Sequence, residues 1–484
     1  MKKLLISLLF IGSSLFSAQA EVKLPAILSD NMVLQQQSEV LLWGWSDSGK
    51  KVDVTTSWNG ESYSTKVGND GKWSLHVTTP EASNIPYSIT FNDGDKLELH
   101  DILIGEVWFC SGQSNMEMPV RGNLNQPVLE GTDYITLAKQ KTPIRMFSIA
   151  KNPQFTEQDD CKGRWEMNTP DVVADFSAVA YFFGHHLQSA LDIPIGLINS
   201  SWGGSKIESW MSEDMLEKFP DVDQTATKSS VMPKEPNREP KFLYNGMIHP
   251  ILGYKFKGML WYQGCANRPN REQHEELMPE FVNTLRKKFD CGEFPLYFAQ
   301  LAPLGYGGGP FFNVSMRESQ VKIKNKISNC QIVIQTDIGE PLSIHPRFKV
   351  TTGKRFAYLA LGDTYGMKGF DYLSPEYDKM KIVSAEKNFK HNSIHLSFKN
   401  APNGINIKGF ESKCFEIAGE DKIFYPAQAK LAKGDYPVIV WSEKVENPVA
   451  VRYAFKEYVE GDLYGHSELP VSSFRTDNWE LPEK

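Results

Sequence analysis

The sequence lacks several patterns that define common functional classes. It has no His-Glu-x-x-His pattern, no Cys-x-x-Cys pair, no internal repeat and no low-complexity tract. Its 52 basic and 59 acidic residues give a formal net charge of -7, without a Lys/Arg stripe. Such a chain has no basic surface for nucleic acid, so we expect no nucleic-acid partner.

Cysteine is also scarce and scattered. The six cysteines lie far apart, at positions 110, 161, 265, 291, 330 and 414. An even count allows disulfides in an exported protein, but the spacing favours cysteines that are mostly free or singly paired, and no metal cluster. Cys110 lies in an apolar run, where a thiol packs well.

Only the first residues form a notable apolar run. The segment "MKKLLISLLFIGSSLFSAQA" has two lysines, a short apolar stretch and a small-x-small site ending at Ala20. This pattern predicts a signal peptide, residues 1–20, cut after Ala20, and a periplasmic or secreted protein. The alternative is an uncleaved anchor, but the stretch is short of the roughly 20 residues of a membrane span. No later segment is apolar enough to span a bilayer.

The 484 residues allow two or three domains. Residues 21–100 alternate between apolar and polar positions with turn signals between, which predicts a small antiparallel β-sandwich. Residues 101–378 alternate apolar strand-like runs with amphipathic helical patterns, which predicts a parallel sheet covered on both faces. A polar stretch at about 212–240 is expected to be a surface excursion. Alternation returns over 379–484 and predicts a second β domain.

Polar residues follow four of the predicted strands of the central region. "SGQSN" places Ser114 after one strand, and "NSSWGGS" places Gly203 and Gly204 after another. "WYQGCAN" ends at Asn267, and "DIGEPLSIHP" carries His345. Because parallel strands end at one edge of a sheet, these groups can converge there. A hydroxyl, free backbone N–H groups, an amide and an imidazole suit acyl transfer.

Each of these residues also has a plain structural interpretation. Ser114 is not in a G-x-S-x-G elbow, because "GQSNM" lacks the second glycine, and alone it would be a helix N-cap. His345 alone would be a residue at a helix start. It is the four strand ends together that favour a catalytic site.

Several linked segments resemble the sialate O-acetylesterase family, a branch of the SGNH hydrolases. They are "GEVWFCSGQSNMEMPV", "IGLINSSWGGSKIESWM", "LYNGMIHPIL", "GMLWYQGCANR", "FAQLAPL", "SIHPRFKVTTGKRFA", "VRYAF" and "FRTDNW". The resemblance implies a flavodoxin-like SGNH α/β fold, a parallel sheet with helices on both faces, flanked by N-terminal and C-terminal β domains. It also implies a serine esterase that needs neither metal nor other cofactor.

The resemblance implies a role for each matching residue. Ser114 would attack the acetyl carbonyl, and His345 would take its proton and pass it to the leaving sugar hydroxyl. The backbone N–H groups of Ser114 and Gly204, with the Asn267 amide, would hold the oxyanion. Gly204 is chosen over the preceding glycine by its spacing from the strand. Gln113 is expected to contact the substrate.

The sequence departs from the family pattern at two places. The carboxylate expected just before His345 is missing. Asp337 or Glu340 could replace it, or a backbone carbonyl could take its place and leave a Ser-His dyad. Asp337 has a structural alternative, in which it bonds only the amides of its own turn. The family Glu-Ser pair is replaced by Cys265 and Ala266, which puts substrate contacts in doubt. Arg268 follows this pair. It is either a partner for a sialate carboxylate or an ordinary surface residue.

Three functional hypotheses remain open from the sequence. The first is an esterase that removes O-acetyl groups from sialic acids on glycans. The second is an acetyl esterase acting on plant polysaccharide, either xylan or pectin. The third is an inactive carbohydrate-binding protein. The sequence leaves the oligomeric state open. Of Trp108, Trp202 and Trp261, which flank the expected site, we expect at least two to belong to the core.

Overall fold

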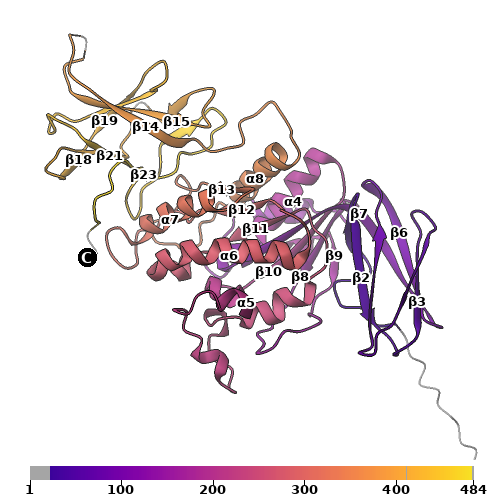
Figure 1. Cartoon of the computed structure of the whole chain (residues 1–484). Helices are drawn as coiled ribbons and strands as arrows, with labels where there is room; N and C mark the ends of the chain where they lie inside the picture. Colours follow the sequence, from indigo (N-terminus) through magenta and orange to yellow (C-terminus); the bar gives the residue numbers. More distant parts are fainter. Residues whose placement is uncertain (1–21, 388, 410, 482–484) are drawn as a thin grey trace, which may run out of the picture.

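The computed structural model describes residues 22–387, 389–409 and 411–481. Figure 1 shows an N-terminal layer of strands, a central α/β region and a C-terminal group of β-sheets, in chain order. The predicted signal peptide lies outside the described residues. Within the described ranges, no helix has the length and apolar character needed to cross a bilayer.

The N-terminal layer is built from short strands with alternating burial. In β2 and β3, Val40, Leu42, Val52 and Val54 are buried and their neighbours are more exposed, as expected for strands with one face on a core. The strands of this layer are β1 (Val33–Gln35), β2 (Glu39–Trp45), β3 (Lys51–Thr56), β4 (Ser62–Lys66), β5 (Lys72–Thr78), β6 (Ser83–Asn92) and β7 (Lys96–Gly112).

Strand β7 belongs to two layers at once. Its first half pairs antiparallel with β6 and, over Leu103–Gly105, parallel with β1. Its second half, from Glu106 to Gly112, pairs with strands of the central sheet. The predicted domain boundary near residue 100 therefore falls inside a continuous strand of 17 residues.

The central sheet has the order β13-β12-β11-β7-β10-β8-β9, and its pairs are parallel except for β8 with β9. The apolar strand-like runs of this region form β7, β10, β11, β12 and β13. The short strands β8 and β9 were not predicted. The strands that join β7 in this sheet are β8 (Ile144–Ser148), β9 (Trp165–Met167), β10 (Ile195–Ser201), β11 (Gly258–Tyr262), β12 (Leu296–Ala299) and β13 (Cys330–Val333).

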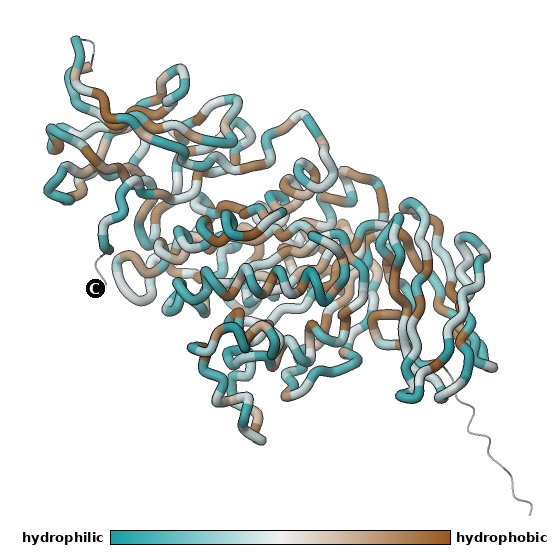
Figure 2. The backbone as a smooth tube through the Cα atoms, in the orientation of Figure 1, coloured by the Kyte–Doolittle hydropathy of each residue, from teal (hydrophilic) through white to brown (hydrophobic). Residues whose placement is uncertain are grey.

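Helices cover both faces of this sheet. Val107 and Phe109 of β7 share one core with α6, whereas Trp108 and Cys110 share the opposite core with α4 and α8. The α-helices are α1 (Ser114–Glu117), α2 (Gly131–Leu137), α3 (Pro170–Asp175), α4 (Ala178–Leu191), α5 (Glu213–Leu216), α6 (Arg271–Phe289), α7 (Phe312–Lys326) and α8 (Lys349–Leu359). In Figure 2 the brown, hydrophobic segments concentrate in the strands.

Two of the three tryptophans near the expected site belong to these cores. Trp108 and Trp261 are fully buried, which confirms the expectation of at least two core tryptophans. Trp202 is half-buried at the end of β10, with the Lys151 ammonium over its ring.

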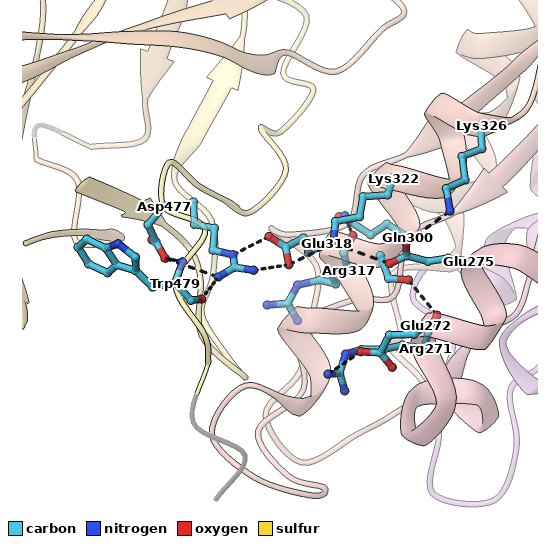
Figure 3. Close-up of polar contacts among 12 residues, drawn as sticks. Arg271, Glu272, Glu275, Gln300, Arg317, Glu318, Lys322, Lys326, Asp477 and Trp479 are labelled. Atoms are coloured by element: carbon cyan, nitrogen blue, oxygen red, sulfur yellow. Dashed lines mark hydrogen bonds and ion pairs between the residues drawn. The ribbon is translucent and has the colours of Figure 1, made fainter. Parts of the chain in front are cut away.

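The C-terminal region consists of small antiparallel sheets that dock on α7. Arg475 bonds the Glu318 carboxylate of α7 at 2.7 and 3.2 Å, and Figure 3 shows Glu318 facing the segment with Asp477 and Trp479. The strands here are β14 (Glu376–Val383), β15 (Ser393–Lys399), β16 (Ile405–Ile407), β17 (Phe415–Ala418), β18 (Phe424–Pro426), β19 (Gln428–Leu431), β20 (Val438–Trp441), β21 (Ala450–Tyr453), β22 (Leu463–Gly465) and β23 (Phe474–Arg475).

The end of β7 is a position that only glycine can occupy without displacement. Gly112 has φ +144°, and a Cβ there would lie 2.3 Å from the Tyr262 carbonyl oxygen. We expect Gly112→Ala to lower the free energy of unfolding by about 1–3 kcal/mol more than Gly94→Ala does, measured by urea denaturation. Gly94 has a similar φ of +123° but open space around it, so equal losses would contradict the steric explanation.

Candidate active site

Three strand ends meet at one level of the sheet. Gly112 of β7 is in register with Ser201 of β10 on one side and with Tyr262 of β11 on the other. The chain order reverses at β7, because the following strands lie on both of its sides. Ligands of open α/β sheets bind at the carboxyl end of such a switch point. Ser114 lies there, two residues beyond Gly112.

Ser114 and His345 are hydrogen-bonded to each other. The Ser114 Oγ lies 2.8 Å from the His345 Nε2, and the His345 Nδ1 lies 3.1 Å from the Gln126 Oε1. An amide oxygen only accepts, so Nδ1 carries the proton and Nε2 accepts from the serine hydroxyl. Both Ser114 and His345 are partly exposed. The imidazole is thus in the tautomer that can take a proton from serine.

Neither acidic candidate contacts the imidazole. Asp337 forms a bidentate ion pair with Arg355, at 2.8 and 2.6 Å. Glu340 accepts from the Arg347 guanidinium and backbone N–H. The structure therefore corrects the expectation that Asp337 orients His345, because that carboxylate is committed to the buried Arg355, and Glu340 is likewise paired with the exposed Arg347.

The residues on either side of Ser114 fix the turn to other strand ends. The Gln113 Oε1 accepts from the Gly264 N–H at 3.0 Å, and the Asn115 Nδ2 donates to the Ile344 carbonyl at 3.0 Å. Gln113 is only 3% exposed, so the structure places this predicted substrate contact in the interior. Asn115 joins the serine turn to the histidine loop in parallel with the Ser114–His345 bond.

A buried lysine lies directly behind this pair of loops. Lys349, at the start of α8, is 1% exposed, and its ammonium donates to the Asn115 Oδ1. Burial lowers the pKa of Lys349 to about 7. Burial and then the Lys349 charge lower the pKa of His345, while the Glu117 carboxylate acts in the opposite direction. Burial and the Lys349 ammonium both favour the neutral imidazole, which is the form that can act as a base.

The turn after β10 places two glycines beside the serine. A Cβ on Gly203 would lie 3.3 Å from the Ser114 Cβ. The Gly203 N–H donates to the Glu117 carboxylate, whose other oxygen pairs with Lys151. Gly204 has φ +73°. Among the described residues, neither the Gly204 N–H nor the Ser114 N–H has an assigned acceptor.

Asn267 is buried in a network of side chains below the Gly203–Gly204 turn. Its Nδ2 donates to the Glu208 carboxylate at 2.8 Å, and its Oδ1 accepts from the Ile207 N–H and from the Gln263 amide. One of the two Nδ2 hydrogens is therefore committed to Glu208. The network fixes the orientation of the Asn267 amide.

Cys265 and Arg268 lie on the 3₁₀ segment η6 (Cys265–Asn270) that carries Asn267. Arg268 is partly exposed, and its Nε donates to the Cys265 carbonyl at 2.9 Å. Burial raises the pKa of the Cys265 thiol. All six cysteines are free thiols in the structure. The described residues include no cluster of His, Cys, Asp or Glu that could hold a metal.

Sequence reasoning missed Gln126, Lys349 and Glu117. Gln126 lies in the polar loop "GNLNQPV", 219 positions from His345, and no local pattern marks it. Lys349 and Glu117 stand inside the motifs around His345 and Ser114. The signal for both was a charged residue close to a candidate catalytic residue, within a segment that is otherwise mostly buried.

Comparison with known proteins identifies the relatives of this chain. A family profile described as "Carbohydrate esterase, sialic acid-specific acetylesterase" matches residues 104–361. Sialate O-acetylesterase from Mus musculus is 28% identical, with 97% of this chain and 97% of the mouse protein aligned. The protein of the same name from Homo sapiens is 27% identical, over 95% and 93% of the two chains.

A solved structure agrees over nearly the whole chain. A carbohydrate acetylesterase from Xanthomonas citri superposes with a TM-score of 0.84 and is 31% identical. The superposition covers 95% of this chain and all of the other. The mixed α/β architecture, with its large mixed sheet and C-terminal β-sheets, is therefore shared with that protein.

The contacts around His345 predict opposite effects of two substitutions. Lys349→Met removes a positive charge and should raise the pKa of His345, whereas Glu117→Gln removes a negative charge and should lower it. The measurement is an NMR titration of the His345 ring. Lys354→Met, at a half-buried lysine on the same helix, is the control and should leave this pKa unchanged. An unchanged pKa in the Lys349 variant would contradict the assigned electrostatics.

Proposed function

The chain belongs to the sialic acid-specific acetylesterase family of carbohydrate esterases and is a carboxylic ester hydrolase, and from this we propose that it removes O-acetyl groups from sialic acids on glycans by Ser114–His345 chemistry. One observation carries the mechanism: the 2.8 Å contact between the Ser114 Oγ and the His345 Nε2 at the sheet's switch point. The proposed substrate follows from the mouse and human relatives, which are sialate O-acetylesterases.

In the proposed first step, the Ser114 Oγ attacks the acetyl carbonyl carbon while its proton passes to the His345 Nε2. The tetrahedral intermediate collapses when Nε2–H protonates the departing sugar oxygen, which leaves an acetyl-serine. Water then attacks the acetyl group, gives its proton to Nε2, and releases acetate as Ser114 regains its proton. Gln126 supports both half-reactions, because its amide oxygen accepts Nδ1–H throughout.

The oxyanion would be held by the backbone N–H groups of Ser114 and Gly204 and by the Asn267 amide. The two N–H groups have no assigned acceptor among the described residues, whereas the Gly203 N–H is occupied by Glu117. This difference favours Gly204 over its neighbour. Asn267 would use the amide hydrogen that Glu208 leaves free. Each such donor contributes roughly 3 kcal/mol to an oxyanion-type transition state.

The central sheet is the part of the fold we assign to the SGNH type. Three features support this assignment. The first strand of the region, β7, lies at the centre of the sheet, the proposed nucleophile directly follows it, and His345 lies on the loop after β13. Helices on both faces agree with a flavodoxin-like arrangement. In this assignment residues 101–378 form the hydrolase domain, and the sheets before and after it are accessory.

Acetate release tests this function directly. We expect the wild type to release acetate from O-acetylated sialoglycans, and Ser114→Ala and His345→Ala each to lower the rate at least about 1,000-fold. Circular dichroism should show both variants folded. A near wild-type rate in either folded variant would remove that residue from the mechanism.

Acetylated xylan is the comparison substrate, because the Xanthomonas relative is described only as a carbohydrate acetylesterase. Release from xylan alone, lost in Ser114→Ala, would keep the chemistry and replace sialoglycan by plant polysaccharide. Release from neither substrate would contradict the proposed function.

Gln126 and Asp337 should behave oppositely. Gln126→Ala removes the acceptor of a hydrogen bond that becomes charge-assisted when His345 is protonated, so kcat should fall about 10- to 100-fold with little change in stability. Asp337→Asn weakens the buried ion pair with Arg355, which should lower the free energy of unfolding by up to about 3 kcal/mol and leave kcat nearly unchanged. Steady-state kinetics and urea denaturation separate the two. A large kcat loss in Asp337→Asn alone would restore an acidic triad.

A further inference from the structure

We propose that the Arg268 guanidinium is the subsite for the carboxylate of an acidic sugar that carries the acetyl group, and that Asn313 and Glu457 are its positioning residues. This inference rests on the proposed function and names the sugar chemistry that the same site selects. Sialic acids and uronic acids share that chemistry, so the subsite distinguishes acidic from neutral sugars.

The guanidinium is held from three directions. Its Nε donates to the Cys265 carbonyl at 2.9 Å, its Nη1 donates to the Asn313 Oδ1, and its Cζ lies 5.3 Å from the centre of the Phe312 ring. Such contacts fix both the position and the direction of the planar fork. Because little further ordering is needed, a ligand that meets this fork binds at a low entropic cost.

Among the arginines of the described residues, Arg268 is distinctive in combining the lack of a counter-ion with a terminal nitrogen that has no assigned acceptor. Across the described residues, no carboxylate lies within ion-pair distance of it, and its Nη2 has no assigned acceptor. Arg286 and Arg317 also lack carboxylates, but their donors are taken by backbone carbonyls and hydroxyls. The remaining arginines pair with Asp or Glu.

A partly buried cation without a counter-ion is unfavourable unless something else meets its charge. A carboxylate accepts two parallel hydrogen bonds from a guanidinium, which a neutral sugar hydroxyl cannot do. A free Nη2 beside a fixed fork therefore favours a carboxylate over a neutral hydroxyl.

Arg268 shares a small cavity with the loops that carry the reacting groups. Arg268 lines a cavity of about 10 Å³ together with Asn115, Ser343 and Ile344, which are the neighbours of Ser114 and His345 in the chain. That volume holds one water-sized group, such as one carboxylate oxygen. A sugar whose acetyl ester lies at Ser114 could thus place a carboxylate at Arg268.

The C-terminal region holds this arrangement through one carboxylate. Glu457 accepts from the Asn313 N–H at 2.8 and 3.0 Å and from the Asn313 Nδ2 at 2.6 Å. The Asn313 Oδ1 is thereby turned toward Arg268. Burial raises the pKa of Glu457, and the N–H donors of Asn313 and Val314 oppose that shift. Glu457 is a positioning residue, since it acts on the sugar only through Asn313 and Arg268.

The test compares a substrate with and without its charge. The probes are the methyl α-glycoside of an O-acetylated sialic acid and the carboxyl methyl ester of the same compound. We expect the wild type to prefer the acid at least 10-fold in kcat/KM, mostly through KM. Arg268→Gln should reduce the preference to about 1, and Arg268→Lys should restore part of it. Asn313→Ala and Glu457→Gln should reduce it severalfold, and circular dichroism should show all of these variants folded.

Two matched substitutions serve as controls. Arg271→Gln removes an arginine three positions away that pairs with Glu272, and Glu460→Gln removes an exposed carboxylate that pairs with Lys408. Both should keep the full preference for the acid. A wild-type preference near 1, or an equal preference in Arg268→Gln, would overturn the proposal. Acetylated oligogalacturonate and acetylated xylo-oligosaccharide then separate sialate from uronate and acidic from neutral sugars.

A binding measurement separates this proposal from the proposed mechanism. In the Ser114→Ala background, calorimetry should show the acid binding at least 10-fold more tightly than its methyl ester, and Arg268→Gln should remove the difference. This result would support the subsite even if Ser114 were shown not to be the nucleophile. Equal binding of acid and ester would reject the subsite even if Ser114 proved essential.

Discussion

The close approach of β7 to β11 at Gly112 determines the geometry of the whole site. The backbone of Tyr262 lies where any side chain at position 112 would be, so the two strands end side by side. The turn that follows is then fixed through Gln113 to Gly264 and through Asn115 to the histidine loop. Ser114 has its position because its neighbours on both sides are bonded to separate strand ends.

The fold could be predicted further than the site. Nearly continuous apolar runs marked the five main strands, since a buried parallel strand needs no polar face. Ser114, Gly204, Asn267 and His345 were predicted because each directly follows such a strand or stands in a linked motif. Gln126 could not be, since its contact with His345 is made between loops far apart in the chain. Asp337 was only one of the open candidates for a partner of His345, and Arg355, on α8, is its partner in space.

Among the described residues, neither Lys349 nor His345 is hydrogen-bonded to a carboxylate. Lys349 contacts the Asn115 amide rather than a carboxylate, and position 265, on the neighbouring η6 segment, holds a thiol. His345 is likewise oriented by the neutral Gln126. Without a carboxylate behind the imidazole, its neutral form is favoured by burial and by the nearby ammonium. In the proposed mechanism these surroundings keep the His345 imidazole free to accept a proton.

The passage of β7 through two layers has a consequence for motion. Accessory β domains joined by a flexible linker can rotate relative to their catalytic domain, because few contacts cross the boundary. Here the boundary is a single strand that is paired along both halves, with β6 and β1 first and with β10 and β11 afterwards. A hinge at that place would have to bend the strand that ends at the serine turn and break its ladder. We therefore expect the N-terminal layer to follow the central sheet rather than to rotate independently of it.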